Sequence, residues 1–244
     1  MADATPDYSA AGFVSEVPDP LRYAGGPFDT FEVTGIVASL LKPGDRILDV
    51  GCGTGSFSRV LLDHCNVHVI GIEPDRARAE VAISRGLKVY IGFLTSELIE
   101  EIGKVDVVLW ADVLEHVAAP YDLLVRSREA LRPGGSVIIS VPNVAHWSIR
   151  ANLMLGHFHY QASGIMDATH LRWFTRETLL SFVSSAGFEV TDYAGSAGIL
   201  APDIETRWPF RWMPVDLRRR FLHSASLRWP ALFACQHVVR AEMK

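Results

Sequence analysis

Short apolar runs alternate with segments of helical periodicity up to about residue 141. The apolar runs predict strands at 46–50, 67–72, 87–91, 105–110 and 136–141. Apolar positions that recur every three or four residues predict helices at about 29–41, 56–63, 75–85, 95–102 and 121–131. Strands that alternate with helices are typical of a parallel sheet covered on both faces, so we expect an α/β fold.

The regularity breaks after Asn143. Residues 144–175 and 196–230 are expected to be irregular insertions that follow strands five and six. Between and after them, the pattern predicts a helix at 176–186 and strands at 188–193 and 232–241. Residues 1–28, rich in Pro, Gly and Ala, form an N-terminal arm, and residues 29–244 form one domain. The pattern does not determine where the seventh strand enters the sheet.

Three glycines follow the first predicted strand: Gly51, Gly53 and Gly55. A strand that ends in a glycine turn lets a ligand approach the backbone at the carboxyl edge of the sheet. A dinucleotide site would need G-x-G-x-x-G, but Ser56 occupies the third glycine position. The charge of Asp49 would repel a phosphate and attract an amino group. The carboxylate of Glu73, at the end of the next strand, could accept hydrogen bonds from both ribose hydroxyls.

The segment Asp49–Gly55, together with Glu73 and Leu131-Arg-Pro-Gly-Gly135, resembles the class I S-adenosylmethionine-dependent methyltransferases over roughly residues 29–241. The resemblance implies a Rossmann-like, seven-stranded, mostly parallel sheet and S-adenosylmethionine as cofactor. It also implies that the arm at 1–28 is a lid. A Rossmann-like domain for another nucleotide and an inactive relative are the alternatives.

The resemblance also implies the roles of individual residues in the cofactor site. The methionine portion is expected near Asp49, Gly51, Cys52, Gly53 and Gly55. The ribose is expected at Glu73 and Pro74, and adenine between Phe93 and Leu94, where the usual acid is missing. The side chain of Asp112, after strand four, could face the methionine end or the methyl acceptor.

The segment Asp112-Val-Leu-Glu115-His116 is the first group that could carry chemistry. It resembles the Glu-x-x-Glu-His segment of ubiquinone-pathway O-methyltransferases, whose side chains are associated with a divalent metal. Two carboxylates and an imidazole could bind such a cation. The alternative, which we favour from the sequence, is that Glu115 and His116 begin a helix and make structural hydrogen bonds. The sequence therefore predicts no metal ligands.

The first insertion holds the second group, in which the phrase Asp167-x-Thr-His170-Leu-Arg-x-Phe-Thr resembles methyltransferases of polysaccharide and natural-product glycosylation pathways. Imidazole is well suited to proton transfer near neutral pH. We expect His170 to be the base, in an acid–base pair oriented by Asp167, with His146 or His116 as the next choice. Alternatively, His170 and Arg172 lock the insertion onto the core as a hydrogen-bonded polar network. A stacking wall is expected from aromatic residues: Trp147, Tyr160, Trp173 and Trp208.

Composition narrows the possible partners and location. The net charge of −5 disfavours a nucleic-acid footprint. Three cysteines without metal spacing fit a reducing compartment, and neither a signal peptide nor a membrane-length apolar run is evident, so we expect a cytoplasmic protein. The tryptophans of the second insertion would suit a homodimer.

The function hypothesis is O-methylation of a small-molecule acceptor, a sugar or a glycosylated natural product, with a histidine as general base. Three alternatives are N-methylation of an amino sugar or other amine, a non-catalytic S-adenosylmethionine-binding protein, and a dehydrogenase.

Overall fold

The computed structural model describes residues 28–198 and 212–244. The predicted lid, apart from Phe28, and Trp208 lie outside these residues. The Phe28 ring stacks on His64 of the first helix that follows the glycine loop, with ring centroids 4.2 Å apart. No helix in the described ranges is long and apolar enough to cross a membrane.

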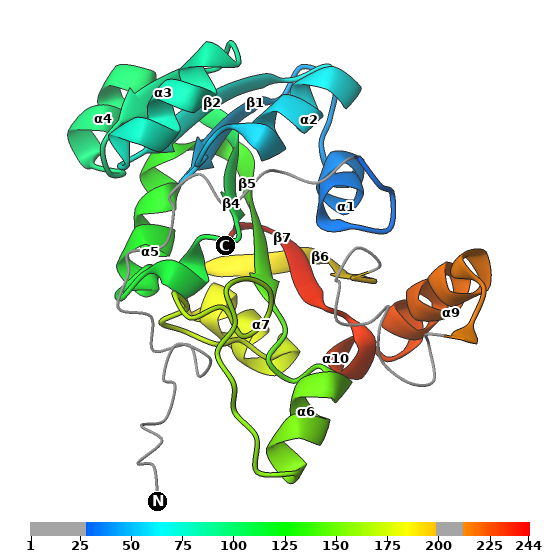
Figure 1. Ribbon diagram of the computed structural model, residues 1–244. Coiled ribbons are helices and arrows are strands. Elements are labelled where there is room, and N and C mark those ends of the chain that lie inside the picture. The colour runs from blue at the N-terminus through cyan, green and yellow to red at the C-terminus, as the bar shows by residue number, and fades with distance from the viewer. Residues whose placement is uncertain (1–27, 199–211) are drawn as a thin grey trace, which may run out of the picture.

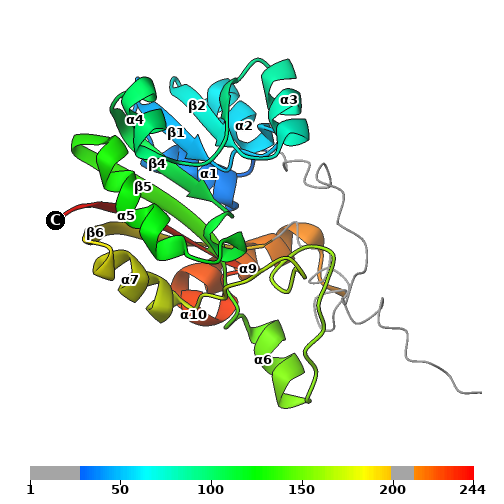
Figure 2. The same cartoon turned by 90° about the vertical axis from the view of Figure 1, so that its left-hand side faces the viewer.

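Within the described residues, seven strands form one sheet in the order β3-β2-β1-β4-β5-β7-β6 (Figures 1 and 2). The strands are β1 (Arg46–Val50), β2 (His68–Glu73), β3 (Lys88–Ile91), β4 (Val105–Ala111), β5 (Leu131–Pro142), β6 (Phe188–Ser196) and β7 (Gln236–Met243). Neighbouring strands from β3 through β5 pair in parallel, whereas β7 pairs antiparallel with both β5 and β6. This arrangement confirms the predicted class I fold and places strand seven, whose position the sequence left open.

Helices cover both faces of the sheet (Figure 2). The helices are α1 (Val33–Leu40), α2 (Ser56–His64), α3 (Arg76–Ser84), α4 (Ser96–Ile102), the 3-10 helix η1 (Leu114–His116), α5 (Pro120–Ala130), α6 (Trp147–Met154), α7 (Arg176–Ser185), α9 (Val215–Arg228) and α10 (Pro230–Phe233). Helix α7 begins at Arg176 as predicted, and Thr175 caps it because the Thr175 hydroxyl accepts from the Thr178 amide. The first five helices of the βα pattern lie within a few residues of their predicted bounds.

Two apolar cores lie on opposite faces of the sheet because successive strand residues point in opposite directions. On β1, Ile47 packs with α1 and α2, whereas Leu48 faces α4, α5 and α7. On β4, Val107 belongs to the same core as Ile47, and Val108 belongs to the same core as Leu48. Strands that are buried on both faces leave only their carboxyl ends and the loops beyond them for chemistry.

The insertions are more regular than predicted. Residues 196–230 were expected to be irregular, but residues 215–228 form α9. Its apolar residues point in several directions, since Leu222 is buried while Leu217 and Phe221 are exposed, so no single apolar stripe marked it as a helix. A short helix, α10, takes the start of the predicted strand 232–241, and β7 therefore begins at Gln236.

Two other predicted boundaries change. Part of the first insertion, 144–175, forms α6, which stands off from the helical layers at the bottom of both views (Figures 1 and 2). Strand β5 begins at Leu131 and not at Ser136, because the Pro133-Gly-Gly135 turn lies inside the strand as a bulge.

Asp49 of β1 is buried, and its carboxylate accepts a hydrogen bond of 2.5 Å from the Ser58 hydroxyl of α2. Burial raises the pKa of Asp49 from 3.8 to about 6, with the Ser58 hydrogen bond opposing the shift and the charge of Glu73 adding to it. The folded protein therefore binds the Asp49 proton more tightly than the unfolded chain does.

We expect wild-type stability, measured relative to Asp49→Asn, to fall as pH rises from about 4 to above 6. Between these values the unfolded carboxyl is ionised while the folded one still holds its proton. The relative loss would be about 3 kcal/mol, since one pKa unit corresponds to about 1.4 kcal/mol. Urea unfolding of both proteins across this pH range measures it, and parallel stability curves would contradict the assignment. Asparagine keeps an oxygen that can accept from Ser58.

Candidate functional site

A cavity of about 1400 Å³ opens where the carboxyl ends of the central strands meet the first insertion. One side comes from the turns after β1, β2 and β4, and the other comes from residues of the insertion and the start of β7. Ligand pockets commonly measure about 300 to 1,000 Å³. This cavity is therefore large enough for a nucleoside cofactor and a second small molecule.

The glycine turn and Glu73 form one unit at the side of the cavity where the cofactor was predicted. The Glu73 carboxylate accepts from the Gly53 amide (2.8 Å) and from the Asp75 amide (2.9 Å). At Gly51, where φ is +77°, an added Cβ would lie 2.9 Å from the Val113 side chain. A side chain at Gly51 would therefore fill the space between the β1 and β4 turns, which only glycine leaves open.

Most of the predicted cofactor residues line the cavity: Gly51, Cys52, Gly53, Glu73, Pro74, Phe93, Leu94 and Asp112. Asp49 and Gly55 do not line it. Asp49 instead holds α2 through Ser58, and Gly55, at φ +73°, starts that helix. The proposed adenine sandwich is asymmetric, because Phe93 is 71% exposed whereas Leu94 is 2% exposed and belongs to the core.

Asp112 lies after β4 in a left-handed conformation, with φ of +54°, which is uncommon for a residue other than glycine. Its carboxylate accepts from the Ser140 hydroxyl (2.9 Å) and from the Gln236 amide (2.8 Å). Although the residue faces the open cavity, the protein packed around its carboxylate raises the pKa of Asp112, and these hydrogen bonds oppose the increase. Asp112 therefore ties β4, β5 and β7 together at the cavity floor.

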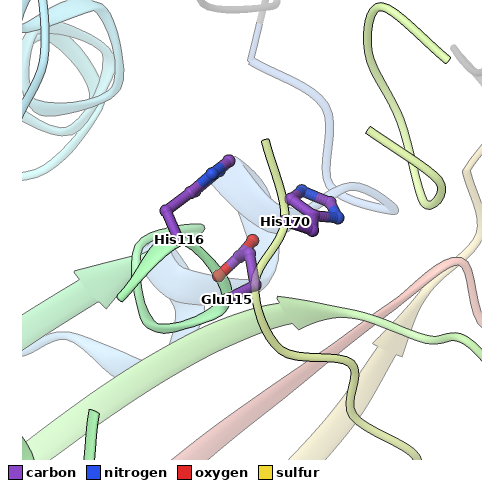
Figure 3. Close-up of side chains that lie close together, drawn as sticks. All are labelled: Glu115, His116 and His170. Carbon is purple, nitrogen blue, oxygen red and sulfur yellow. The ribbon is translucent and has the colours of Figure 1, made fainter. Parts of the chain in front are cut away.

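Glu115, His116 and His170 form a cluster in which one ligand atom of each lies within 4.8 Å of the others. Figure 3 shows the Glu115 carboxylate between the two imidazoles. Glu115 and His116 come from η1, and His170 comes from the first insertion. The Glu115 carbonyl holds the two segments together by accepting from the Leu171 amide (2.7 Å) and the Arg172 amide (3.0 Å).

Backbone carbonyls orient both imidazoles of the cluster. The Nδ1 of His170 lies 3.1 Å from the Ile165 carbonyl, and the Nδ1 of His116 lies 3.3 Å from the Thr169 carbonyl. A carbonyl only accepts, so Nδ1 carries the proton in each contact. In this tautomer the lone pair of each ring is on Nε2, where it can accept a proton or bind a cation.

The Glu115 carboxylate is 1% exposed, and neither of its oxygens has a hydrogen-bond partner. Burial is the main reason that the pKa of Glu115 lies well above its ordinary value, and the charges of Asp112 and Asp167 raise it further. Burying a charged carboxylate without a hydrogen-bond partner costs free energy. A proton or a bound cation would remove this cost by neutralising the charge of Glu115.

The other predicted catalytic residues have structural contacts. His146 is 1% exposed, caps α6 and contacts the Ser148 hydroxyl through Nδ1 (2.8 Å) and the Cys235 thiol through Nε2 (3.7 Å). Asp167 accepts from the Thr169 amide (2.8 Å) and hydroxyl (2.6 Å), which shapes the turn that leads to His170.

The cavity does not contain the predicted stacking residues that the structure describes. Trp147, Tyr160 and Trp173 do not line the cavity, whereas Phe158 of the same insertion does. The insertion also lines the cavity with polar side chains: Asn152, His157, His159 and Gln161. Among the described residues, the cavity lining contains six carboxylates, from Glu32, Glu73, Asp75, Asp112, Glu115 and Asp167, and one cationic side chain, that of Arg78. The cavity therefore favours positively charged groups.

Sequence reasoning missed several residues of the site. Cys235 and Gln236 stand at the start of β7 and reach the cavity because that strand enters beside β5. No local signal marked them, since the position of the strand was open. Glu115 was weighed as a structural or metal-binding residue, but its proximity to His170 depends on how the insertion docks.

Comparison with known proteins gives the family. Residues 32–193 match the family model described as "Methyltransferase domain". The chain is 33% identical to the "Ubiquinone biosynthesis O-methyltransferase" of Azorhizobium caulinodans over 168 residues, which cover 65% of each protein. It is 36% identical to the protein of the same name from Roseobacter denitrificans over 107 residues, or 41% of this chain and 42% of that protein. The chain thus spans less than two thirds of the length of these relatives.

Solved structures agree on the fold. A SAM-dependent methyltransferase from Archaeoglobus fulgidus matches with a TM-score of 0.55 and 17% identity, covering 85% of this chain and 93% of that one. A possible histamine N-methyltransferase from Thermotoga maritima matches with a TM-score of 0.54 and 19% identity, covering 85% and 86%. With the family match over most of the domain and the strand order seen here, the chain belongs to the methyltransferase domain family and has the class I S-adenosylmethionine-dependent methyltransferase fold.

Proposed function

We propose that this protein transfers a methyl group from S-adenosylmethionine to a hydroxyl of a small molecule. The observation that carries the proposal is that one cavity contains both the unit of Glu73 and the glycine turn and the cluster of Glu115, His116 and His170. The first can hold a nucleoside, and the second can take up a proton in the same cavity. The similarity to proteins named O-methyltransferases supports oxygen as the atom that is methylated.

The cofactor site suits a nucleoside that lacks phosphates. Each Glu73 oxygen accepts one backbone amide and has a further lone pair for a ribose hydroxyl. The exposed Phe93 ring is available to stack on adenine. The six carboxylates of the cavity lining favour the sulfonium and ammonium groups of S-adenosylmethionine over the phosphates of a dinucleotide.

The chain's own contribution to the reaction is alignment, exclusion of water and removal of one proton. When bound, S-adenosylmethionine supplies an activated methyl group on sulfur. The acceptor oxygen must lie in line with that methyl group, and its proton must leave. We propose that this deprotonation depends on His170, whose Nδ1 is held by the Ile165 carbonyl so that Nε2 has the lone pair. His146 is a weaker choice because both of its ring nitrogens have structural contacts.

A sugar or a glycosylated natural product is the acceptor class that we propose. The insertion lines the far side of the cavity with hydrogen-bonding side chains, from Asn152, His157, His159 and Gln161, and with the ring of Phe158. Such a combination of polar groups and one aromatic surface suits a polyhydroxylated molecule. A small-molecule acceptor, no nucleic acid and a homodimer remain predictions about partners.

Capture of the methyl group tests the proposed function. The full chain would be incubated with isotopically labelled S-adenosylmethionine and small-molecule acceptors, and labelled products would be identified by mass spectrometry. We expect a label attached to oxygen. A label on nitrogen would replace the proposal by amine methylation, and tight binding of S-adenosylhomocysteine without any product would favour a binding protein.

Replacement of Glu73 by glutamine should weaken S-adenosylhomocysteine binding. The glutamine has one NH₂ group where Glu73 has an oxygen, so one backbone amide or ribose hydroxyl would lose its acceptor. The loss should cost about 1 to 3 kcal/mol of binding free energy, which raises Kd about 5- to 150-fold. Calorimetric titration measures the change, and a thermal unfolding curve checks the fold. Glu80→Gln, on the exposed face of α3, is the matched control. Unchanged binding in Glu73→Gln would remove Glu73 from the cofactor site.

Replacement of His170 by alanine should lower kcat at least about 100-fold, because positioned proton transfer commonly contributes that much or more. Affinity for S-adenosylhomocysteine should stay within about twofold, since we place His170 on the acceptor side. The control is His68→Ala, an exposed histidine at the start of β2, outside the cavity. Turnover near the wild-type rate in His170→Ala would refute this role of His170.

A further inference from the structure

We propose that Glu115, His116 and His170 bind a divalent transition-metal ion, and that His170 completes this site in place of Asp112. The sequence resemblance suggested Asp112, Glu115 and His116 as the metal-associated residues, and from sequence we favoured no metal at all. The side-chain arrangement points to a different set of ligands, one of which comes from the first insertion.

The first argument is the unpartnered carboxylate of Glu115. It is 1% exposed, neither oxygen accepts a hydrogen bond, and it faces two imidazoles (Figure 3). Two further carboxylates, those of Asp112 and Asp167, act on it electrostatically. A cation at this point would give Glu115 a partner and balance the excess negative charge of the cavity lining.

The second argument is the orientation of the donors. Metal-binding histidines usually donate their other ring N–H to a carbonyl or carboxylate, which fixes the tautomer. Both His116 and His170 have Nδ1 against a backbone carbonyl, as this pattern requires. Three ligands of a tetrahedral zinc ion lie about 3.4 Å apart when each is about 2.1 Å from the metal. The observed limit of 4.8 Å thus needs side-chain shifts of only about 1 Å to close on an ion.

The third argument excludes Asp112 from the set. Its two carboxylate oxygens accept from Ser140 and from Gln236, which join it to β5 and β7. Its backbone is also held in the left-handed region, so it cannot turn toward η1 without disturbing three strands. Asp112 therefore contributes charge near the site while His170 supplies the third ligand atom.

The donor set indicates which ions to test. Two imidazole nitrogens and one carboxylate suit zinc and the neighbouring transition metals, whereas magnesium and calcium prefer oxygen ligands. Three protein ligands leave further positions open to water or an acceptor hydroxyl. A bound ion of this kind lowers the pKa of such a hydroxyl, which is the chemistry it would supply if the proposed function holds. His170 would then be a ligand in the loaded protein and a base only in the metal-free protein.

Metal binding can be measured without turnover. The full chain would be stripped with a chelator, and zinc binding would be followed by titration calorimetry, with cobalt(II) absorption as a second readout of ligand type. We expect one ion per chain and nitrogen–oxygen coordination without thiolate bands. Glu115→Gln and His170→Ala should each weaken zinc binding by at least about 100-fold, more than loss of an outer-shell partner commonly costs.

The controls separate this site from the alternatives. Asp112→Asn removes charge near the site but no proposed ligand atom, so it should weaken zinc binding far less than Glu115→Gln or His170→Ala does. His68→Ala should bind zinc within about twofold of the wild type, and thermal unfolding curves should show that every variant is folded. Loss of binding in Asp112→Asn with retention in His170→Ala would replace our ligand set by the one that the resemblance suggested. The absence of stoichiometric binding in the wild type would overturn the proposal and leave the proposed methyl transfer untouched. Conversely, one bound ion without any methylated product would count against the proposed function alone.

Discussion

The side of the cavity that we propose for the methyl acceptor depends above all on a backbone contact, in which the Glu115 carbonyl accepts from the amides of Leu171 and Arg172. The contact fixes the insertion to η1 at the carboxyl edge of the sheet, and it does so one residue beyond His170. The contact of His116 Nδ1 with the Thr169 carbonyl joins the same two segments, so His170 is held beside the buried carboxylate from both sides of its own position in the chain. The fully buried Leu114 side chain anchors η1 in the core, so the contact is in turn supported by the packing of the sheet.

The side that we propose for the cofactor depends on a different kind of constraint. There the turn after β1 and the carboxylate at the end of β2 are joined directly, by the hydrogen bond from the Gly53 amide to Glu73. The two strands are parallel neighbours in register, so their ends meet at the same level. This part of the site is built from local turns on a rigid sheet, whereas the acceptor side is built from a docked insertion. A scaffold of this kind can keep its cofactor while the insertion changes its acceptor.

The difference explains how much the sequence could predict. The turn of Gly51 and Gly53 and the carboxylate of Glu73 belong to a local pattern, and they lie where the pattern placed them. Glu115 and His170 are far apart in the chain. The periodicity of apolar positions does not indicate how an insertion packs against the sheet, so it could not bring these two residues together. His146 looked like a base because of its residue type, but its position before Ser148 makes it a helix cap. Helix α9 was missed because its exposed apolar residues obscure the helical stripe.

The position of β7 has a consequence for how the chain folds. This strand is the last in the sequence of the described residues, yet it lies inside the sheet between β5 and β6. Among the described strands, β6 pairs with β7 alone, so β6 cannot join the sheet until β7 has been synthesised. During synthesis the ribosome releases β7 after every other strand, and until then the edge of β5 is open. The half of the sheet that supports the acceptor insertion therefore assembles late, through contacts of long sequence separation, and is the part of the molecule most exposed to misassembly.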